Sequence, residues 1–325
     1  MRIPKESTNL TAMAPTGYDI IGDIHGHGDE LLALLDKLGY VNDGDSYSSP
    51  ENRQALFLGD FIDRGPQQRV VLNTVMAMTR TGSARAVMGN HEFNAIQFHT
   101  ADPENPGCWL RPRNDKNIGQ HFSFLSEYLS HPKELADVIS WFRQLPLWIE
   151  IPHGPRLVHA CWHEEEMCKI KHRCDSNAVP SEELLLESSR KGTAAYQAIE
   201  ILLKELEVSV PESFLDKDGN RRNEVRTKWW LNDPSDLNEI ALPAGILNTS
   251  STIKLDKGSV PGYRPSHCPV FVGHYWWKGN PEPLEDNVAC LDYSVAKGGA
   301  LVAYRWSYSG KLIADNFVVI PSIPR

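Results

Sequence analysis

Three short apolar segments occur close together near the beginning of the chain, at residues 18–22, 54–59 and 84–89. Each has the length and apolar character of a buried strand, and each ends at a glycine. Residues 29–40 and 68–80, which separate these segments, carry leucine, valine and methionine at helical spacing. This alternation of strands and helices predicts an α/β fold in which helices cover an open sheet.

The rest of the chain is less regular. A strand-like segment returns at residues 156–159, and several more occur toward the end of the chain. One long helix is expected within residues 181–207, where apolar side chains recur in a charged stretch. We expect a single domain over residues 1–325, with cap insertions over approximately residues 97–150 and 164–265.

Polar residues follow directly after each of the three early strands. They include carboxylate, imidazole and amide side chains, which are the oxygen and nitrogen donors that divalent metals prefer. Because ligands bind at the carboxyl ends of strands in an open α/β sheet, these residues are expected to meet in one site. The residues are Asp23, His25, Asp60, Asp63, Arg64, Asn90 and His91.

The segments GDIHG, GDFIDRG and GNHE, at residues 22–26, 59–65 and 89–92, resemble the signature motifs of the calcineurin-like metallophosphoesterases, in their phosphoprotein-phosphatase branch. Residues 18–40 are especially similar to the phosphatase module of bacterial polynucleotide kinase-phosphatase and to diadenosine tetraphosphatase-type enzymes. The resemblance implies a β-sandwich flanked by helices, with an inserted cap region.

The resemblance also implies two divalent metal ions, with manganese expected and iron, zinc or cobalt as alternatives. It requires two further histidines that each follow an apolar strand, and His159 and His274 occupy such places. The ligands implied for one metal are Asp23, His25 and Asp60, and those for the other are Asp60, Asn90, His159 and His274.

Catalytic roles follow from the same resemblance. A hydroxide that bridges the metals would attack phosphorus in line, hydrolysing a phosphate monoester. Arg64 would bind two phosphate oxygens beside Asn90, His91 would protonate the leaving oxygen, and Asp63 would hold the other ring nitrogen of His91. A second phosphate-binding arginine is sought later in the chain, and Arg226 is favoured for that place.

The substrate is left open by the sequence. A protein or small-molecule phosphatase is expected, with a dinucleoside polyphosphate hydrolase or an RNA end phosphatase as alternatives. A non-catalytic metal-binding scaffold is the alternative of a different class. The rings of Trp276 and Trp277 follow His274 closely, so they either border the pocket or fill the core. His163 is read as a loop residue in preference to a zinc ligand.

The charge of the chain limits its partners. With 33 basic and 42 acidic residues the formal net charge is −9, which disfavours an extended nucleic-acid track and leaves open a phosphorylated small molecule, peptide or nucleotide. The opening residues contain no apolar run typical of a signal peptide, and no stretch has the roughly 18 apolar residues of a membrane span. We therefore expect a cytoplasmic protein.

Overall fold

A six-stranded sheet contains the three strands predicted near the beginning of the chain. The computed structural model describes residues 14–215, 219–247, 251–308 and 310–324, so the opening residues tested for a signal peptide lie largely outside it. The strand order is β13-β14-β1-β4-β5, with β15 pairing β14. Strands β1, β4 and β5 are mutually parallel, and β14 runs antiparallel to β1. The strands are β1 (Tyr18–Ile21), β4 (Gln54–Phe57), β5 (Ala84–Ala86), β13 (Asp292–Tyr293), β14 (Ala300–Trp306) and β15 (Phe317–Pro321).

A second sheet of four strands has the order β12-β11-β7-β6. Its strands are β6 (Trp148–Glu150), β7 (Arg156–Val158), β11 (Val270–Val272) and β12 (Val288–Cys290). Strand β7 pairs in parallel with β11, although more than a hundred residues separate them in the sequence. Strand β6 lies within the first expected cap insertion but pairs antiparallel with β7.

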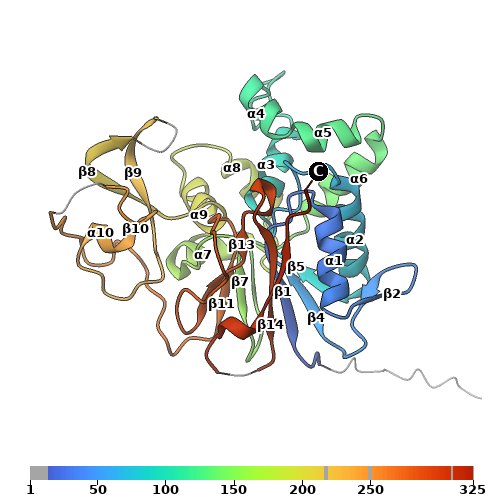
Figure 1. Ribbon diagram of the computed structural model, residues 1–325. Coiled ribbons are helices and arrows are strands. Elements are labelled where there is room, and N and C mark those ends of the chain that lie inside the picture. Colours follow the sequence, from blue (N-terminus) through green and yellow to red (C-terminus); the bar gives the residue numbers. More distant parts are fainter. Residues whose placement is uncertain (1–13, 216–218, 248–250, 309, 325) are drawn as a thin grey trace, which may run out of the picture.

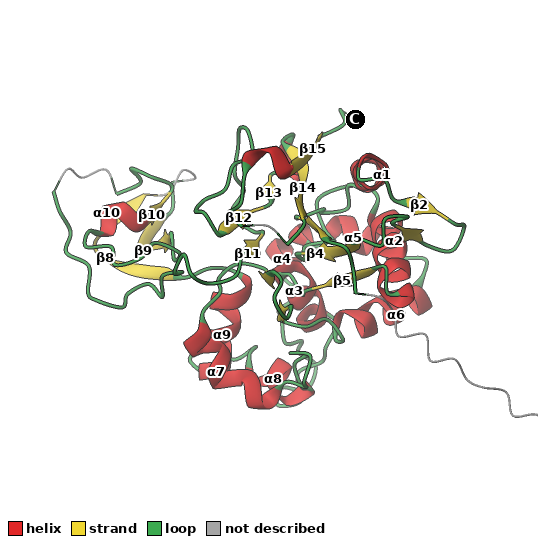
Figure 2. Cartoon of the chain, turned by 90° about the horizontal axis from the view of Figure 1, so that it is seen from below, coloured by secondary structure: helices red, strands yellow, loops and turns green. Residues whose placement is uncertain are grey.

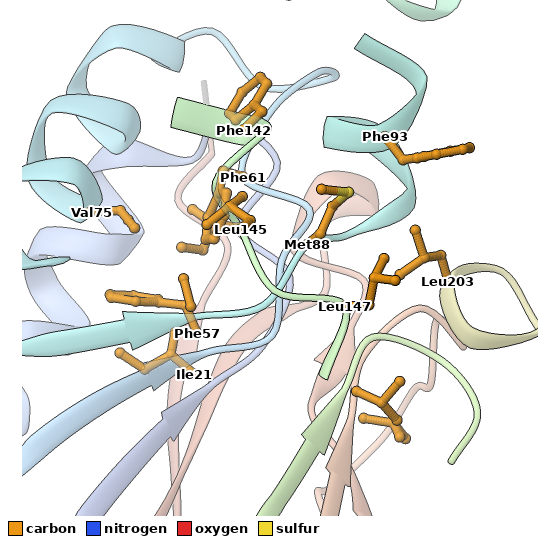
Figure 3. Packing of buried hydrophobic residues seen from close by; sticks show 14 of the residues in the cluster. Ile21, Phe57, Phe61, Val75, Met88, Phe93, Phe142, Leu145, Leu147 and Leu203 are labelled. Carbon is orange, nitrogen blue, oxygen red and sulfur yellow. The ribbon is translucent and has the colours of Figure 1, made fainter. Parts of the chain in front are cut away.

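The two sheets pack face to face, which confirms the expected sandwich. Because side chains alternate along a strand, Ile20 and Phe271 enter the cluster between the sheets, whereas Ile21 and Val272 point to the outer faces. Figure 3 shows Ile21 and Phe57 in the outer cluster, near Val75 of helix α2 (Gln68–Thr81). Buried apolar side chains on both faces explain why these short strands have nearly continuous apolar sequences.

Helices cover the outer faces. Helices α1 (Gly28–Lys37) and α2 (Gln68–Thr81) match the two predicted helical segments and lie together beside the larger sheet (Figure 1). Helix α3 (Asn90–Phe98) begins shortly after β5. The first insertion forms α4 (Asp115–Gln120), α5 (Phe122–Tyr128) and α6 (Pro132–Phe142).

The long helix expected within residues 181–207 is wrong. The segment forms two short helices, α8 (Glu182–Glu187) and α9 (Ala194–Leu203), which follow α7 (Glu164–Ile170). Gly192 between them has φ +89°, and the Thr193 side chain accepts a hydrogen bond from the amide of Tyr196, which starts a new helix. A left-handed glycine followed by a capping threonine therefore separates the two helices.

A small three-stranded sheet, of order β10-β9-β8, stands apart from the sandwich (Figure 2). It consists of β8 (Glu207–Leu215), β9 (Arg221–Thr227) and β10 (Ala241–Leu242), with the short helix α10 (Leu237–Ile240) packed on it. Val225 and Ile240 belong to its own apolar cluster. None of the helices in the described ranges is long and apolar enough to cross a bilayer. The division into one domain with two cap insertions stays a prediction.

Candidate metal centre

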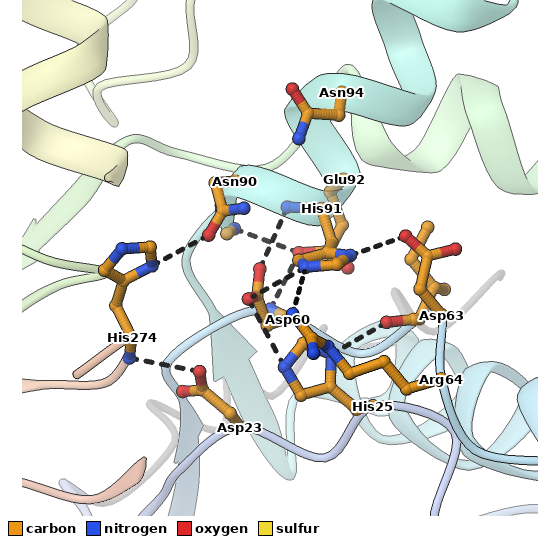
Figure 4. Close-up of polar contacts among 12 residues, drawn as sticks. Asp23, His25, Asp60, Asp63, Arg64, Asn90, His91, Glu92, Asn94 and His274 are labelled. Atoms are coloured by element: carbon orange, nitrogen blue, oxygen red, sulfur yellow. Dashed lines mark hydrogen bonds and ion pairs between the residues drawn. The ribbon is translucent and has the colours of Figure 1, made fainter. Parts of the chain in front are cut away.

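Six predicted ligand residues meet at one end of the sandwich, each placed by the end of a strand. Figure 4 shows Asp60 at the centre, with His25, Asp23, His274 and Asn90 around it. They come from both sheets, since His159 follows β7 and His274 follows β11, whereas the others follow β1, β4 and β5. The predicted convergence at the strand ends is therefore what the fold produces.

One group of donor atoms combines Asp60 with two histidines that follow strands of the four-stranded sheet. His159 Nε2 is 3.4 Å from Asp60 Oδ1 and 3.1 Å from Asn90 Oδ1. His274 Nδ1 is 2.9 Å from the same Asn90 oxygen. Donor atoms of Asp60, His159 and His274 all lie within 4.8 Å of one another, a spacing at which they could hold one ion.

A second group lies on the other side of Asp60. His25 Nε2 is 3.6 Å and His91 Nε2 is 3.8 Å from Asp60 Oδ2. Donor atoms of His25, Asp60 and His91 lie within 4.8 Å of one another, and Asp23 is in neither group; its Oδ2 accepts a hydrogen bond of 3.0 Å from the amide of His274. Asp60 thus faces both groups, one oxygen to each, as a bridging ligand must.

Two buried atoms in this centre show that the residues fit metal ions. Asp23 Oδ1 and His25 Nε2 are buried and have no hydrogen-bond partner among the described residues. A buried polar atom without a partner is costly, so both atoms call for a ligand. His25 Nδ1 is 2.9 Å from the carbonyl of Ile62 and His159 Nδ1 is 2.7 Å from that of Leu58. In a neutral ring, donation to these carbonyls would leave Nε2 free to bind a metal ion.

The electrostatics of the centre also call for cations. Burial raises the pKa of Asp23, and the neighbouring Asp292 and Asp60 raise it further. Burial likewise raises the pKa of Asp292 to about 6. Burial would raise the pKa of Asp60 too, but His159 and His91 hold it well below its usual range. Several carboxylates are therefore confined together away from water, an arrangement that divalent cations stabilise.

The backbone that carries the ligands is strained. His25, Asp60 and His274 have φ values of +46°, +50° and +70°, a region that side chains with a Cβ rarely adopt. Such strain gathers at functional sites because the surrounding structure enforces it. A Cβ on Gly273 would lie 2.0 Å from Asp23 Oδ1, so any larger residue there would force the Asp23 carboxylate to move.

Glu92 braces the centre through three backbone amides. Its carboxylate accepts hydrogen bonds from the amides of Gly89, Asp60 and Phe61, at 3.0, 2.8 and 2.9 Å. Burial and the nearby Asp60 raise its pKa to about 7. Glu92 is in neither group of donor atoms and fixes the loops that carry Asp60 and Asn90.

His91 stands beside the centre with its second ring nitrogen held by Asp63. The distance from His91 Nδ1 to Asp63 Oδ2 is 2.5 Å. Burial would lower the pKa of His91, but Asp60 and Asp63 outweigh it and the pKa is raised. The other oxygen of Asp63 lies 2.7 Å from Nδ1 of His121, a residue that the sequence interpretation missed. No motif or spacing links His121 to Asp63, which lies 58 residues away and precedes the first insertion.

Arg64 lies against an aromatic ring and extends toward His91. Its guanidinium carbon is 4.1 Å from the centre of the Trp276 ring, and its Nη2 is 3.5 Å from His91 Nε2. Lys297 Nζ lies 3.2 Å from the centre of the same ring. Trp276 thus borders the site, whereas Trp277 packs against both apolar clusters of the sandwich. Of the two alternatives, bordering the pocket therefore holds for Trp276, and packing against the core holds for Trp277.

Arg226 lies at the edge of the centre, beside Glu205. Its Nε is 2.8 Å from Glu205 Oε1, and Glu205 Oε2 is 3.8 Å from His274 Nε2. The guanidinium is therefore engaged by a carboxylate, and its role as a second phosphate ligand stays a prediction. His163 precedes helix α7 and is in neither group of donor atoms.

A cavity of about 840 Å³ opens directly onto this centre. Arg64, Asn90 and His91 form one end of it, and residues of the first insertion form the other. A reactive phosphoryl group could therefore reach the histidine and arginine side chains from a space large enough for a substrate.

Comparison with known proteins gives a family and a set of relatives. The family model for calcineurin-like phosphoesterases matches residues 18–210. An asymmetrical bis(5'-nucleosyl)-tetraphosphatase PrpE of Halalkalibacterium halodurans is 47% identical over 74 residues, which are 23% of this chain and 30% of that protein. A symmetrical bis(5'-nucleosyl)-tetraphosphatase of Hamiltonella defensa is 32% identical over 129 residues, 39% of this chain and 38% of that protein. The matched segments thus span about a third of the length of these relatives.

Among solved structures, a cold-active protein tyrosine phosphatase superposes with a TM-score of 0.50. The two chains are 17% identical, and the match covers 94% of this chain and 79% of the other. At this identity the likeness concerns the fold alone.

Proposed function

Because the chain belongs to the calcineurin-like phosphoesterase family, we propose that it hydrolyses phosphate esters with two divalent metal ions at the candidate centre. The observation that carries the proposal is the position of Asp60 between two groups of donor atoms, each within 4.8 Å. Asp23, His25 and Asp60 would hold one ion. The second would be held by Asp60, Asn90, His159 and His274. Manganese is the proposed metal.

When bound, the two ions would lower the pKa of a water molecule and offset negative charge on the phosphoryl oxygens. The side chains of the chain supply the other parts of the reaction. Arg64 would bind two phosphoryl oxygens, since no carboxylate in the described part of the chain forms an ion pair with it. His91 would give the proton on Nε2 to the leaving oxygen, while Asp63 keeps the ring oriented through Nδ1.

A phosphate monoester on a peptide or small molecule is the proposed substrate. A dinucleoside polyphosphate is the second candidate, favoured by the names of the relatives and by the size of the cavity. No observation favours RNA ends. A protein surface that binds RNA must be basic, whereas the net charge of this chain is −9. A cytoplasmic location and a single domain over residues 1–325, with its two cap insertions, remain part of the proposal.

The proposal is tested with the purified chain and added divalent metals. Hydrolysis of p-nitrophenyl phosphate, or of its bis ester, is expected with manganese. If no divalent metal supports turnover of either ester, the chain is the non-catalytic scaffold that the sequence left as an alternative.

Two variants separate the roles of the residues. His91→Asn should lower kcat by about 10²–10⁴-fold while the metal content stays near that of the wild type. Asp60→Asn should lose both metals together, because one oxygen faces each group. Loss of metal with His91 would show that this histidine is a ligand and not the acid.

A further inference from the structure

The cavity extends well beyond the reactive centre, into a region that no step of the proposed reaction uses. Helix α3 forms one wall and carries Asn94 one turn after His91, pointing away from Asp60 (Figure 4). The segment from Arg111 to Ser123 forms another wall, and Lys204, at the end of helix α9, comes from the second insertion. Both insertions therefore contribute to the far end of the cavity.

The lining of this cavity is cationic, although the chain as a whole is acidic. Arg64, Arg111, Lys116 and Lys204 line it, and Asp63 is the one carboxylate among the described lining residues. That carboxylate is already held by two histidines. Lys204 forms an ion pair with Glu200, which leaves Arg111 and Lys116 as the cations available at the far end.

Arg111 is held in place by neutral partners. Its Nη1 donates to Asn94 Oδ1 at 2.7 Å and its Nη2 donates to Gln120 Oε1 at 2.9 Å. Among the described residues it forms no ion pair with a carboxylate, in contrast with Arg69, which Glu134 binds at 2.8 Å. Burial lowers the pKa of Arg111, and the carboxylates of Asp63 and Glu200 offset this only in part. A half-buried guanidinium that is oriented by amides, without a carboxylate in direct contact, is typical of a binding site for an anion.

The spacing along helix α3 relates this guanidinium to the reactive centre. Asn94 follows His91 by three residues, which places it about 4.5 Å further along the helix axis. Because Arg111 donates to Asn94, its guanidinium lies beside the helix that carries the proposed acid. Arg111 and His91 therefore line the same cavity from neighbouring positions.

We propose that the far end of the cavity binds a second phosphoryl group of a substrate that carries a linear chain of phosphates, with Arg111 and Lys116 as its anchors. The inference rests on the proposed function, since the first phosphoryl group would lie at Arg64 and His91. Asn117, Gln120 and Ser123 line the same end and offer neutral hydrogen-bonding groups to the phosphate oxygens. The cations gather in one cavity and do not form a track, which suits a compact oligophosphate.

The test compares inhibition by inorganic tripolyphosphate with inhibition by orthophosphate, against hydrolysis of p-nitrophenyl phosphate. Manganese is kept at one fixed excess over tripolyphosphate, so that chelation is the same for every variant. Arg111→Gln and Lys116→Gln remove the two anchors, and Lys116 is exposed, so its replacement does not disturb packing. Lys133→Gln removes one exposed charge at the start of helix α6, outside the cavity, and is the matched control.

Each anchor variant should weaken tripolyphosphate about tenfold, equal to about 1.4 kcal/mol, and orthophosphate less than about threefold. The control should change neither. Equal weakening of both anions, or the same effect from Lys133→Gln, would overturn the inference. If the chain hydrolyses no ester, the proposed function fails, but calorimetric titration of tripolyphosphate still tests the site. Loss of binding in the anchor variants then supports it, and unchanged binding refutes it.

Discussion

Replacing His121 with phenylalanine should destabilise the metal-free protein by about 1.5–3 kcal/mol at pH 7, the usual contribution of a hydrogen bond to a charged group. His121 is buried, and its Nδ1 lies 2.7 Å from Asp63 Oδ1. Phenylalanine keeps the ring that stacks on Phe124, with ring centres 4.7 Å apart, so the hydrogen bond is the main loss.

The dependence on pH identifies the cause of this destabilisation. Burial would raise the pKa of Asp63, but the hydrogen bonds from His121 and His91 outweigh it and hold that pKa well below its usual range. A carboxylate with a lowered pKa stabilises the fold above its unfolded value of about 3.9, and this stability is lost as the pH falls. The difference between wild type and His121→Phe should therefore be full at pH 7 and shrink below about pH 4.

Urea denaturation of both proteins across this pH range measures the effect. His131→Phe is the control, because His131 is partly exposed and its loss should change the free energy of unfolding by no more than about 0.5 kcal/mol. With manganese added, hydrolysis of p-nitrophenyl phosphate should show kcat about ten- to a hundredfold lower in His121→Phe, since His91 loses a support of its orienting carboxylate. A difference under about 0.5 kcal/mol at pH 7, or one independent of pH, would mean that only the ring of His121 matters.

Three further outcomes follow from the geometry of the centre. Gly273→Ala should lose bound metal by elemental analysis, because the new Cβ would lie 2.0 Å from Asp23 Oδ1; full metal content would contradict this. Trp276→Ala removes the ring under Arg64 and should raise KM for p-nitrophenyl phosphate at least about threefold with little change in kcat, whereas a fall in kcat alone would refute a role in binding. Dialysis against EDTA should lower Tm, and manganese should restore it, because Asp23 and Asp60 lose their counter-ions; a Tm indifferent to metal would exclude tight binding at this centre.

The early strands and the ligands that follow them were predictable because the information is local. Each apolar segment specifies a buried strand, and parallel neighbours bring their carboxyl ends to one edge of the sheet. Asp23, Asp60 and Asn90 are therefore neighbours in space, regardless of how the insertions fold. His159 and His274 were found by the same rule, since each follows a short apolar strand.

The structure of the insertions was not predictable in the same way, because it depends on contacts between residues far apart in the sequence. The hydrogen bond between His121 and Asp63 joins residues of two elements with no shared periodicity. Arg111 was likewise without a signal, since its partners Asn94 and Gln120 are ordinary polar residues. The helix expected within residues 181–207 failed for a local reason, since the left-handed turn at Gly192 outweighed the apolar spacing on either side.

The net charge of −9 and an anionic substrate are compatible because of where the charges lie. The acidic side chains at the centre, Asp23, Asp60 and Asp292, are buried together, and burial raises the pKa of two of them. Protons and divalent ions are therefore alternative ways to neutralise the same carboxylates. With two ions bound, these carboxylates would no longer repel a phosphoryl group. The potential in the cavity would then be set by Arg64 and Arg111, which have no carboxylate partner in the described part of the chain.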